Sequence, residues 1–484
     1  MFGCENLPID DTEDDNPTID DEDKWQLYAS SGYGNSIFLS EEKSIENNEI
    51  EEEWFDGDDL DTDNHALNWD APPCPAPLGI SHIIKMGTCN YCLSRISGLR
   101  NNDYEILSGF EIRKQALERD TELSQSSKEE LCPFCENLFD DVENISQRVL
   151  ERLEGIEVDT IQFGIHMPKD LIQEEDRIRT KYGATGSLPL KSALVEEIHK
   201  NIKSANNQIT FVKERPNVMV LVDALTLRAD VDIRPIYLYG RYKKFERGIP
   251  QTRWPCRACR GRGNHCTSCN ETGLQYPNSV QDLIGEPIRE VLKGSDTSFH
   301  GMGREDIDVR CLGDGRPFVI EIKRPELRNY SPEELQKIVN SKAKKYVEVT
   351  ELQWCEKKRI VEVKESRTEK SYTIRFKLIE YNEINFDEIK DKINSLSGQT
   401  IEQQTPKRVS HRRSDIKRER KIISISDIIS EEDEIQISLR CEAGTYVKEL
   451  IHSDDGRTQP SVSGIIGCKC EVIWLDVSDI HYDL

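Results

Sequence analysis

The stretch that decides the fold is residues 303–323, GREDIDVRCLGDGRPFVIEIK. Between residues 307 and 311 apolar side chains alternate with charged ones, which is typical of a strand with one buried face. Residues 318–322 show the same alternation, and Gly313-Asp314-Gly315 between the two runs suits a tight turn. The stretch therefore predicts a β-hairpin. Its entry loop, residues 303–306, places a carboxylate beside a guanidinium at the mouth of a sheet.

Length and charge distribution limit the class of protein. A chain of 484 residues is long enough for about two to four domains with substantial cores. The net charge is −26, but residues 1–70 contain 23 acidic and 2 basic residues, so residues 71–484 are nearly neutral at −5. We expect residues 1–72 to form a disordered acidic tail, because they offer too little apolar surface to offset the entropy lost on ordering.

The chain shows no signal for a membrane or for secretion. It has no run of about 18 apolar residues, so we expect no membrane span. Residues 1–15 lack a basic segment followed by an apolar one, so we expect no secretion signal. Eight of the 15 cysteines form four Cys-x-x-Cys pairs, which in such a chain indicate metal ligands rather than disulfides.

The four cysteine pairs predict two structural zinc sites. Two pairs supply the four thiolates of a tetrahedral site, which leaves no open position for a substrate. Free thiols in a core are the alternative. The first site would consist of Cys89, Cys92, Cys132 and Cys135, and the second of Cys256, Cys259, Cys266 and Cys269.

Periodicity predicts alternating strands and helices in the rest of the chain. A capping box at Ser331-Pro332-Glu333-Glu334 should start a helix that ends near residue 346. Apolar patterns predict strands at 158–165, 218–222, 231–239, 358–364 and 371–381, and a helix at 190–204. Two basic segments, 240–251 and 403–421, suit contact with RNA, although a solvated surface is the ordinary role of such segments.

Several motifs resemble those of one enzyme family. Gly-Arg-Glu-Asp at residues 303–306 resembles the Gly-Arg-Thr-Asp segment that carries the catalytic aspartate of pseudouridine synthases. The run from 303 to 322 resembles the tRNA pseudouridine synthases of the archaeal and eukaryotic Pus-ten family. Residues 240–251, 370–372, 403–413 and 444–450 resemble further motifs of the same family. The resemblance extends from about residue 80 to the C-terminus and is strongest from residue 238 onward.

The resemblance implies roles for individual residues. Asp306 would be the catalytic carboxylate, Lys448 the cation that keeps it ionised, and Tyr372 the ring that stacks on the detached uracil. Val447 and Leu475 would wall the pocket, and Arg241 would guide the flipped-out nucleotide. The substrate-binding set is Tyr372, Arg241, Val447, Lys448, Leu475 and Arg304, and the RNA-binding set is Arg247, Arg408, Arg412 and Arg413.

The resemblance also implies the architecture. We expect an α+β protein whose catalytic domain is a mixed, largely antiparallel sheet with flanking helices. The acidic tail, 1–72, would precede a Cys₄ zinc module with a helical insert, 73–150. A THUMP-like RNA-binding region, 151–275, would end in the second zinc loop and lead to the catalytic domain, 276–484.

The implied function is isomerisation of uridine to pseudouridine in the T arm of tRNA, at position 55 and possibly 54, without a catalytic cofactor. We expect a cytoplasmic monomer, or a nuclear one if the source is eukaryotic. Two alternatives stay open. One is a non-catalytic zinc-containing RNA-binding protein, from which convergence of Asp306, Tyr372 and Lys448 on one pocket would distinguish an enzyme. The other is a J-type chaperone cofactor, suggested by Cys-x-x-Cys-x-Gly-x-Gly at 256–263 but lacking a His-Pro-Asp turn.

Overall fold

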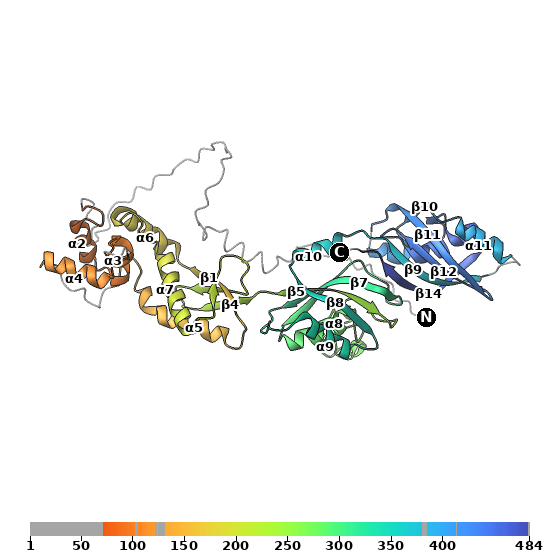
Figure 1. Ribbon diagram of the computed structural model, residues 1–484, viewed down its shortest axis with the longest axis horizontal. Coiled ribbons are helices and arrows are strands. Elements are labelled where there is room, and N and C mark those ends of the chain that lie inside the picture. Colours follow the sequence, from red (N-terminus) through yellow and green to blue (C-terminus); the bar gives the residue numbers. More distant parts are fainter. Residues whose placement is uncertain are drawn as a thin grey trace, which may run out of the picture. The chain divides into compact units, whose positions relative to one another are not determined.

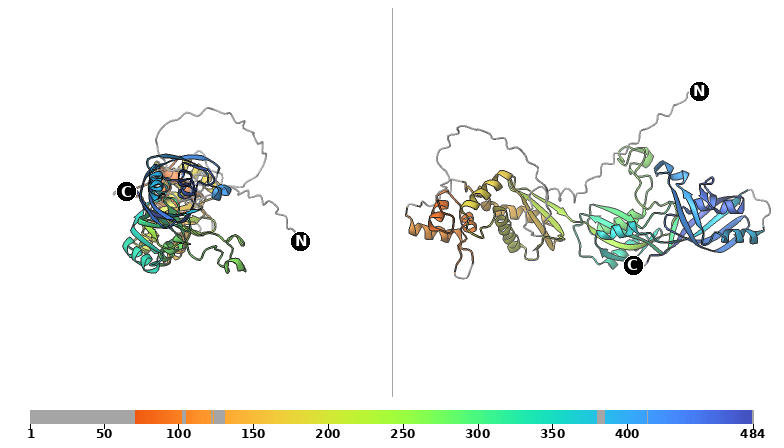
Figure 2. Two further views of the ribbon diagram at one scale, coloured as in Figure 1. Left: turned by 90° about the vertical axis from the view of Figure 1, so that its right-hand side faces the viewer. Right: turned by 90° about the horizontal axis from the view of Figure 1, so that it is seen from above.

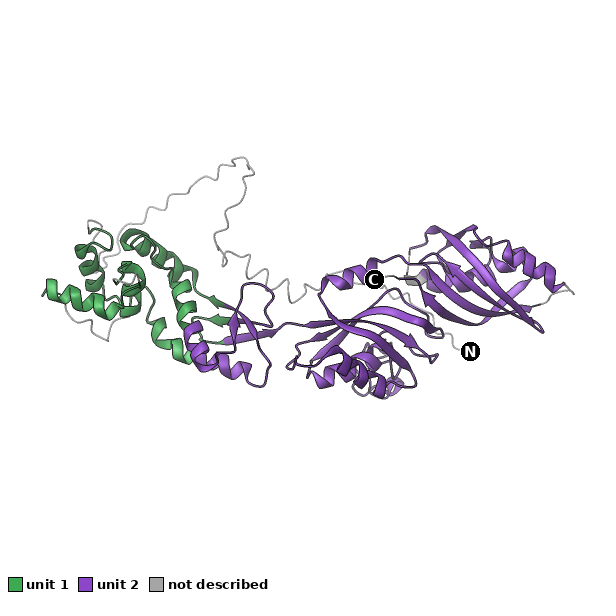
Figure 3. Cartoon of the chain, viewed as in Figure 1, with its two compact units in different colours: residues 1–145, 164–198, 221–228 green, residues 146–163, 199–220, 229–484 purple. Residues whose placement is uncertain are grey.

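The computed structural model describes residues 71–101, 105–121, 123, 131–379, 385–412 and 414–482 (Figure 1). The predicted acidic tail lies outside the described residues except for its last two positions. The chain forms two compact units, coloured separately in Figure 3. Unit 1 consists of residues 1–145, 164–198 and 221–228, and unit 2 of residues 146–163, 199–220 and 229–484.

Unit 1 is largely helical, and one of its helices contains Cys92 and is capped by Cys89. The bounds of the helices are Pro77–Lys85 (α2), Asn90–Ser97 (α3), Gly109–Arg119 (α4) and Lys169–Tyr182 (α6), and α7 covers Leu190–Ala205. The predicted helix at 190–204 is therefore confirmed. A buried ion pair fastens α3 to α6, with Arg95 Nη1 2.6 Å from Glu175 Oε1. Arg95 also donates to the backbone oxygen of Leu188, so this buried charge is fully partnered.

A four-stranded sheet with the order β2-β1-β3-β4 follows the first helices. Its strands are Thr160–His166 (β1), Thr210–Phe211 (β2), Val218–Asp223 (β3) and Ala229–Ile233 (β4), and helix α5, Val142–Leu153, precedes them. Buried and half-buried residues alternate along β3, as its period-2 sequence requires. The predicted strands at 158–165 and 218–222 are confirmed.

A ten-stranded sheet dominates unit 2, with the order β13-β10-β11-β12-β9-β14-β7-β5-β8 and β6 paired to β7. Its strands are Ile236–Lys244 (β5), Asp296–Gly301 (β6), Arg310–Lys323 (β7), Val347–Cys355 (β8), Lys370–Ile379 (β9), Thr400–Gln404 (β10), Lys417–Glu431 (β11), Glu434–Cys441 (β12), Thr458–Gln459 (β13) and Lys469–Ile480 (β14). The pairs are antiparallel except β7–β14, which is parallel. The expected mixed, largely antiparallel sheet is thus confirmed.

Helices flank this sheet and divide its core in two. Those near β5–β8 are Val280–Val291 (α8), Pro332–Lys342 (α9) and Lys358–Glu365 (α10). Those near β9–β14 are Phe386–Asn394 (α11), Val447–His452 (α12) and Val462–Ile466 (α13). One buried apolar cluster includes Ile284, Phe318 and Leu335, and a second includes Val309, Ile374 and Leu450. Because β7 contributes to both clusters, it joins the two halves of the sheet.

The decisive stretch is one bent strand, and the predicted hairpin is wrong. Strand β7 runs without reversal through Gly313 and Gly315, whose φ angles are +59° and +82°. On the neighbouring strand, Tyr242 pairs with Arg316 and Lys244 pairs with Cys311, so residues 312–315 form a bulge opposite a single residue. The two glycines therefore allow a bulge instead of a turn. A Cβ at Gly313 would lie 2.1 Å from the Ser478 oxygen, so a larger residue does not fit there.

Two further predictions need correction, and one is confirmed. Residues 358–364 form helix α10 rather than a strand, because Ile360 and Val363 are buried at a helical spacing of three. Residues 231–239 are divided between β4 and β5. The helix expected after Ser331 is present with its capping box, although it ends at Lys342.

The predicted domain boundary at 275/276 stays a prediction, but β5 lies before it and is hydrogen-bonded to β7 and β8 of the ten-stranded sheet. Among the described residues, no helix is long and apolar enough to cross a membrane.

Candidate active site

A cleft of about 710 Å³ lies on the ten-stranded sheet, within unit 2. The loop that carries the predicted catalytic residue, residues 303–309, forms one wall between β6 and β7, and we call it the catalytic loop. Strands β9 and β14, helix α12 and the segment from 408 to 420 form the others. The predicted residues that line this single cleft are Arg304, Asp306, Tyr372, Arg408, Val447, Lys448 and Leu475.

Two cations hold the Asp306 carboxylate. Arg408 Nη1 lies 3.1 Å from Asp306 Oδ2, and Lys448 Nζ lies 3.4 Å from the same oxygen. Both contacts reach the same carboxylate oxygen, so this oxygen is paired with two side chains of opposite charge. About a third of its side chain stays exposed, at 35%, so the carboxylate is reachable from the cleft.

Arg408 was predicted to contact RNA phosphates, but it lies between two carboxylates of its own chain. Its Nε is 2.6 Å from Glu449 Oε1, and the Glu449 side chain is only 2% exposed. Although burial opposes the effect, the hydrogen bond that Arg408 donates to Glu449 and the charges of Glu449 and Asp306 raise the pKa of Arg408. The guanidinium is therefore fixed in place beside Asp306.

Lys448 pairs more closely with Asp308 than with Asp306. Its Nζ lies 2.8 Å from Asp308 Oδ2, and this contact lowers the pKa of Asp308 against the opposing effect of burial. Asp308 belongs to a turn of the catalytic loop and not to a strand, so the position that the hairpin prediction gave it is wrong. Lys448 thus bridges two carboxylates of one loop.

A fully buried cluster of polar side chains holds the catalytic loop from beneath. Arg316 Nε lies 2.9 Å from Glu305 Oε2, and the two side chains are 2% and 0% exposed. The Tyr242 hydroxyl donates to Glu305 Oε1 at 2.8 Å, and Gln251 Nε2 donates to the Gly303 oxygen at 3.0 Å. Because these partners satisfy the buried charges, the backbone on both sides of Arg304 is fixed.

The contacts of Arg241 change the interpretation of residues 240–251, which were expected to contact RNA. Arg241 is 5% exposed and donates to the backbone oxygens of Asp314, Gly315 and Ile480 at 2.9, 3.2 and 3.3 Å. Arg241 is not among the residues that line the cleft, so its predicted contact with the flipped-out nucleotide is not supported by this geometry. It joins β5 to the bulge of β7 and to the end of β14.

Three predicted residues contribute to the apolar part of the cleft. Tyr372 on β9 pairs with Val477 on β14, and Leu475 is two residues from Val477, so the tyrosine ring and the leucine lie on adjacent strands. Val447 begins α12 and is 5% exposed. Burial, followed by the nearby Cys441, raises the pKa of the Tyr372 hydroxyl, which stays protonated at neutral pH.

The remaining predicted site residues are more scattered. The Arg304 guanidinium lies over the Trp254 ring, 5.2 Å from its centre, at the edge of the cleft. Arg247 is outside the cleft lining, and it donates to the backbone oxygens of Asp308 and Leu475 at 2.7 and 3.0 Å. Arg413 and the side chain of Arg412 lie outside the described residues.

Sequence reasoning missed several residues that line the cleft. The lining contains eight basic residues and three acidic ones, so its charge is strongly positive. The residues that the prediction did not assign to the site include Trp254, Lys364 and Lys370, whereas Arg418 and Arg420 lie in the segment 403–421 that was expected to contact RNA. Lys370 was visible as the first residue of Lys370-Ser371-Tyr372, but a motif does not reveal which of its side chains face a cleft.

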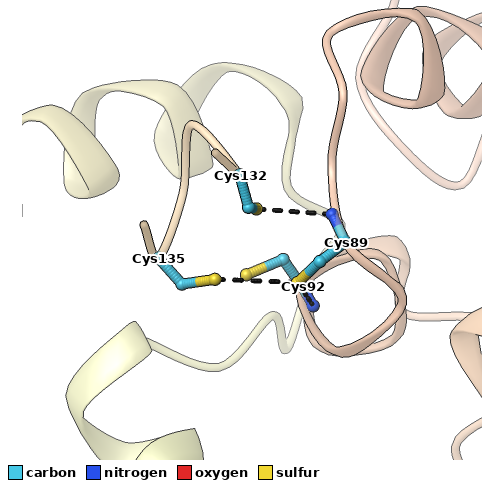
Figure 4. Close-up of side chains that lie close together, drawn as sticks. All are labelled: Cys89, Cys92, Cys132 and Cys135. Carbon is cyan, nitrogen blue, oxygen red and sulfur yellow. Dashed lines mark hydrogen bonds between the residues drawn. The ribbon is translucent and has the colours of Figure 1, made fainter. Parts of the chain in front are cut away.

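Both sets of paired cysteines are assembled as predicted. In each set the four Sγ atoms lie within 4.8 Å of one another. Figure 4 shows the side chains of Cys89, Cys92, Cys132 and Cys135 facing one another. The Cys92 amide donates to Cys89 Sγ at 3.4 Å. Four thiolates at this spacing, with N–H donors to sulfur, fit a tetrahedral metal ion.

The second set lies in an exposed loop that projects from the sheet of unit 2 (Figure 2). The Gly263 amide donates to Cys259 Sγ at 3.3 Å and lowers the pKa of this thiol to about 7. Gly263 has a φ of +76°, and a Cβ there would lie 2.5 Å from the Glu271 oxygen. The glycine is therefore needed for the loop to close around its cysteines.

Comparisons with known proteins agree with this architecture. The family described as "Pus10, C-terminal" matches residues 237–481, and "Pus10 THUMP domain, archaeal" matches residues 145–223. These matches define a protein that joins a THUMP domain to the C-terminal domain of a Pus10 protein. The chain belongs to the Pus10 family.

Two curated relatives illustrate the similarity. The tRNA pseudouridine synthase Pus10 of Methanocaldococcus jannaschii is 39% identical over 357 residues, which cover 73% of this chain and 76% of the relative. The protein of the same name from Methanothermobacter marburgensis is 38% identical over 395 residues, which cover 81% of this chain and 94% of the relative. A chain in the structure titled "Crystal Structure of a Cbf5-Nop10-Gar1 Complex" is 16% identical, with a TM-score of 0.23. The match covers 40% of this chain and 43% of that one. A TM-score this low carries no structural argument.

Proposed function

We propose that this chain is a tRNA pseudouridine synthase that isomerises uridine in the T arm of tRNA, at position 55 and possibly at 54. The observation that carries the proposal is the convergence of Asp306, Tyr372 and Lys448 on one cleft. A non-catalytic RNA-binding protein has no need for an exposed carboxylate held by two cations beside a tyrosine. The membership of the Pus10 family supports the same reaction.

The proposed mechanism starts from the side chain of Asp306. Arg408 and Lys448 contact its carboxylate oxygen, and the buried Glu305 fixes the loop that carries it. A flipped-out uridine would stack on Tyr372, between Val447 and Leu475, where the apolar walls exclude water. Asp306 would act on the nucleotide while the uracil turns within the pocket and bonds again through C5. The reaction needs no catalytic cofactor.

The positive charge of the cleft is suited to the tRNA backbone. Arg418 and Arg420 lie on β11 and line the cleft, as does Lys364 in the last turn of α10. We infer that these side chains meet phosphates near the target, while the THUMP domain binds RNA elsewhere. Arg412 and Arg413 stay candidates for the same contact.

We also propose that each Cys₄ set holds one structural zinc ion. Four thiolates leave no position for a substrate, so the metal would stabilise the fold and take no part in the reaction. We expect the protein to act as a cytoplasmic monomer, or in the nucleus if the source is eukaryotic.

The test of the proposed function uses the full chain and an unmodified tRNA transcript. Pseudouridine is mapped by carbodiimide modification and primer extension. The proposal expects a new stop at position 55, with or without one at 54. No stop anywhere in the T arm would contradict it.

A further inference from the structure

Lys370 is a cation of the cleft that the proposed mechanism does not use. It is the first residue of β9, it is half-buried, and it lines the cleft together with Tyr372. Residues two apart on a strand point to the same face of the sheet. The lysine and the tyrosine therefore share the wall against which the uracil would stack.

The ammonium group lies beside the start of the catalytic loop. A Cβ placed on Gly303 would be 3.0 Å from Lys370 Nζ and 3.5 Å from Arg316 Nη1. Gly303 has a φ of +70°, which favours glycine there, and a Cβ would also crowd the end of the Lys370 side chain. Lys370 thus reaches the loop three residues before Asp306.

The protein does not neutralise this charge. Arg316 is paired with Glu305, but among the residues that the structure describes no carboxylate oxygen lies within 4.0 Å of Lys370 Nζ. The nearby thiols of Cys311 and Cys441 are neutral, because burial raises the pKa of Cys311 to about 11 and that of Cys441 to about 12. A half-buried lysine without a counter-ion is costly unless a ligand supplies one.

The reaction itself produces a negative charge in this place. Whichever atom Asp306 attacks, the C1′–N1 bond must break, and its electron pair leaves with the uracil. The negative charge spreads over N1, O2 and O4 until C5 bonds to C1′, after which C5 loses a proton and N1 gains one. No oxidant or reductant is required, so charge stabilisation is the chemical help that a nearby cation can give.

We propose that Lys370 is a catalytic residue that binds the departing uracil anion through its ammonium group. The proposal rests on the proposed function, because it needs a glycosidic bond to be broken in the cleft. It gives the spacing of Lys370 and Tyr372 on one strand a chemical reason, because one side chain stacks on the ring and the other meets its charged edge.

The charge of Lys370 is itself sensitive to pH. Burial is the main cause that lowers the pKa of Lys370 to about 8, and the charge of Arg316 lowers it further, while the Glu305 carboxylate opposes this. The lysine is therefore charged below pH 8 and loses its charge as the pH rises through that value. Substrate that carries negative charge will shift this transition upward once it is bound.

The test measures single-turnover release of tritium from C5-labelled uridine in a tRNA transcript, with tRNA affinity measured separately by filter binding. Lys370→Met should lower the rate at saturating protein by about 10²-fold, with the Kd for tRNA changed by less than about threefold. Lys370→Arg should keep most of the rate. Lys377→Met is the control, because Lys377 is on the same strand but does not line the cleft, and its Nζ lies 2.8 Å from Asp433 Oδ2. This variant should react at the wild-type rate.

The pH profile separates this role from a structural one. At subsaturating tRNA the wild-type rate should fall as the pH rises above about 8, because Lys370 loses its charge there. Lys370→Met should lack this fall in rate. Lys370→Arg should keep its rate to higher pH, because arginine stays charged. The wild-type and arginine profiles decide the matter even if the methionine variant does not fold.

Three results would overturn the proposal. If Lys370→Met is as active as an active wild type, Lys370 takes no part in the reaction, and the proposed function is unaffected. A weaker Kd with an unchanged saturating rate would make Lys370 a phosphate contact. A wild-type protein that releases no tritium would contradict the proposed function itself.

Discussion

Arg408 Nη1 lies 3.1 Å from Asp306 Oδ2, while Nε of the same guanidinium lies 2.6 Å from the buried Glu449. Two carboxylates therefore fix the arginine in both position and charge. Because Arg408 comes from the basic segment between β10 and β11, this segment reaches into the active site and does not only face the RNA backbone. The first prediction follows from this contact.

Arg408→Met should reduce the single-turnover rate by roughly 10²-fold, because Asp306 loses its nearest cation and Glu449 loses its partner. The Kd for tRNA should change by only a few-fold, since one phosphate contact carries a small share of the binding. Lys407→Met is the matched control, because Lys407 pairs with the exposed Asp455 at 2.6 Å. A large loss of tRNA affinity with a normal rate at saturating protein would contradict this prediction and would show that Arg408 acts mainly in binding RNA.

The buried pair under the catalytic loop should dominate stability. Glu305→Gln leaves Arg316 as an unpaired buried charge, and we expect the free energy of unfolding to fall by about 3–5 kcal/mol, as measured by urea denaturation. The control is Glu290→Gln. It breaks the pair between Glu290 and Lys342, whose 2.6 Å distance is shorter but whose side chains are exposed, so the free energy of unfolding should change much less. Equal costs for the two variants would contradict the idea that Glu305 anchors the loop.

The zinc prediction is quantitative. Elemental analysis of the purified protein should give two zinc ions per chain. Cys132→Ser and Cys256→Ser should each lose one of them, whereas Cys311→Ser, outside both sets, should keep both. Chelation should destabilise the two zinc-binding regions before the ten-stranded sheet, because metal binding there is coupled to folding. A metal content of one or none would contradict the assignment.

Much of the fold could be predicted from the sequence where the signal is local. The capping box at Ser331, the helix from Leu190 and the strand at β3 all follow from short patterns, and the structure confirms them. The cysteine sets were also predictable, because their spacing alone encodes the ligand geometry. What failed depended on partners far away in the chain.

The hairpin is the clearest failure. Gly313 and Gly315 have the positive φ angles that a turn needs, but their purpose is set by Ser478 and Tyr242, whose backbones lie against them. A sequence pattern contains no information about this contact. Arg241 shows the same limit, since a basic residue among aromatics looks like an RNA contact until its backbone acceptors are seen.

The candidate site was predictable in its residues but not in its pairing. Resemblance supplied Asp306, Tyr372 and Lys448, and the structure places them in one cleft. It assigned Lys448 to Asp306 alone, whereas the geometry divides Lys448 between Asp306 and Asp308 and adds Arg408. Asp308→Asn should therefore reduce activity in part, by freeing Lys448, and a single-turnover rate equal to that of wild type would show that this pair does not matter.

The central claim is that Asp306 is the catalytic carboxylate, and Asp306→Asn tests it most directly. The substitution keeps the size of the side chain and removes its charge. The measurement is tritium release from C5-labelled uridine in an unmodified tRNA transcript at saturating protein, with the Kd measured in parallel. The account predicts that release is abolished while the Kd stays within a few-fold of wild type, because the basic lining of the cleft is unchanged. Release at close to the wild-type rate would contradict the assignment of the catalytic loop and the mechanism built on it.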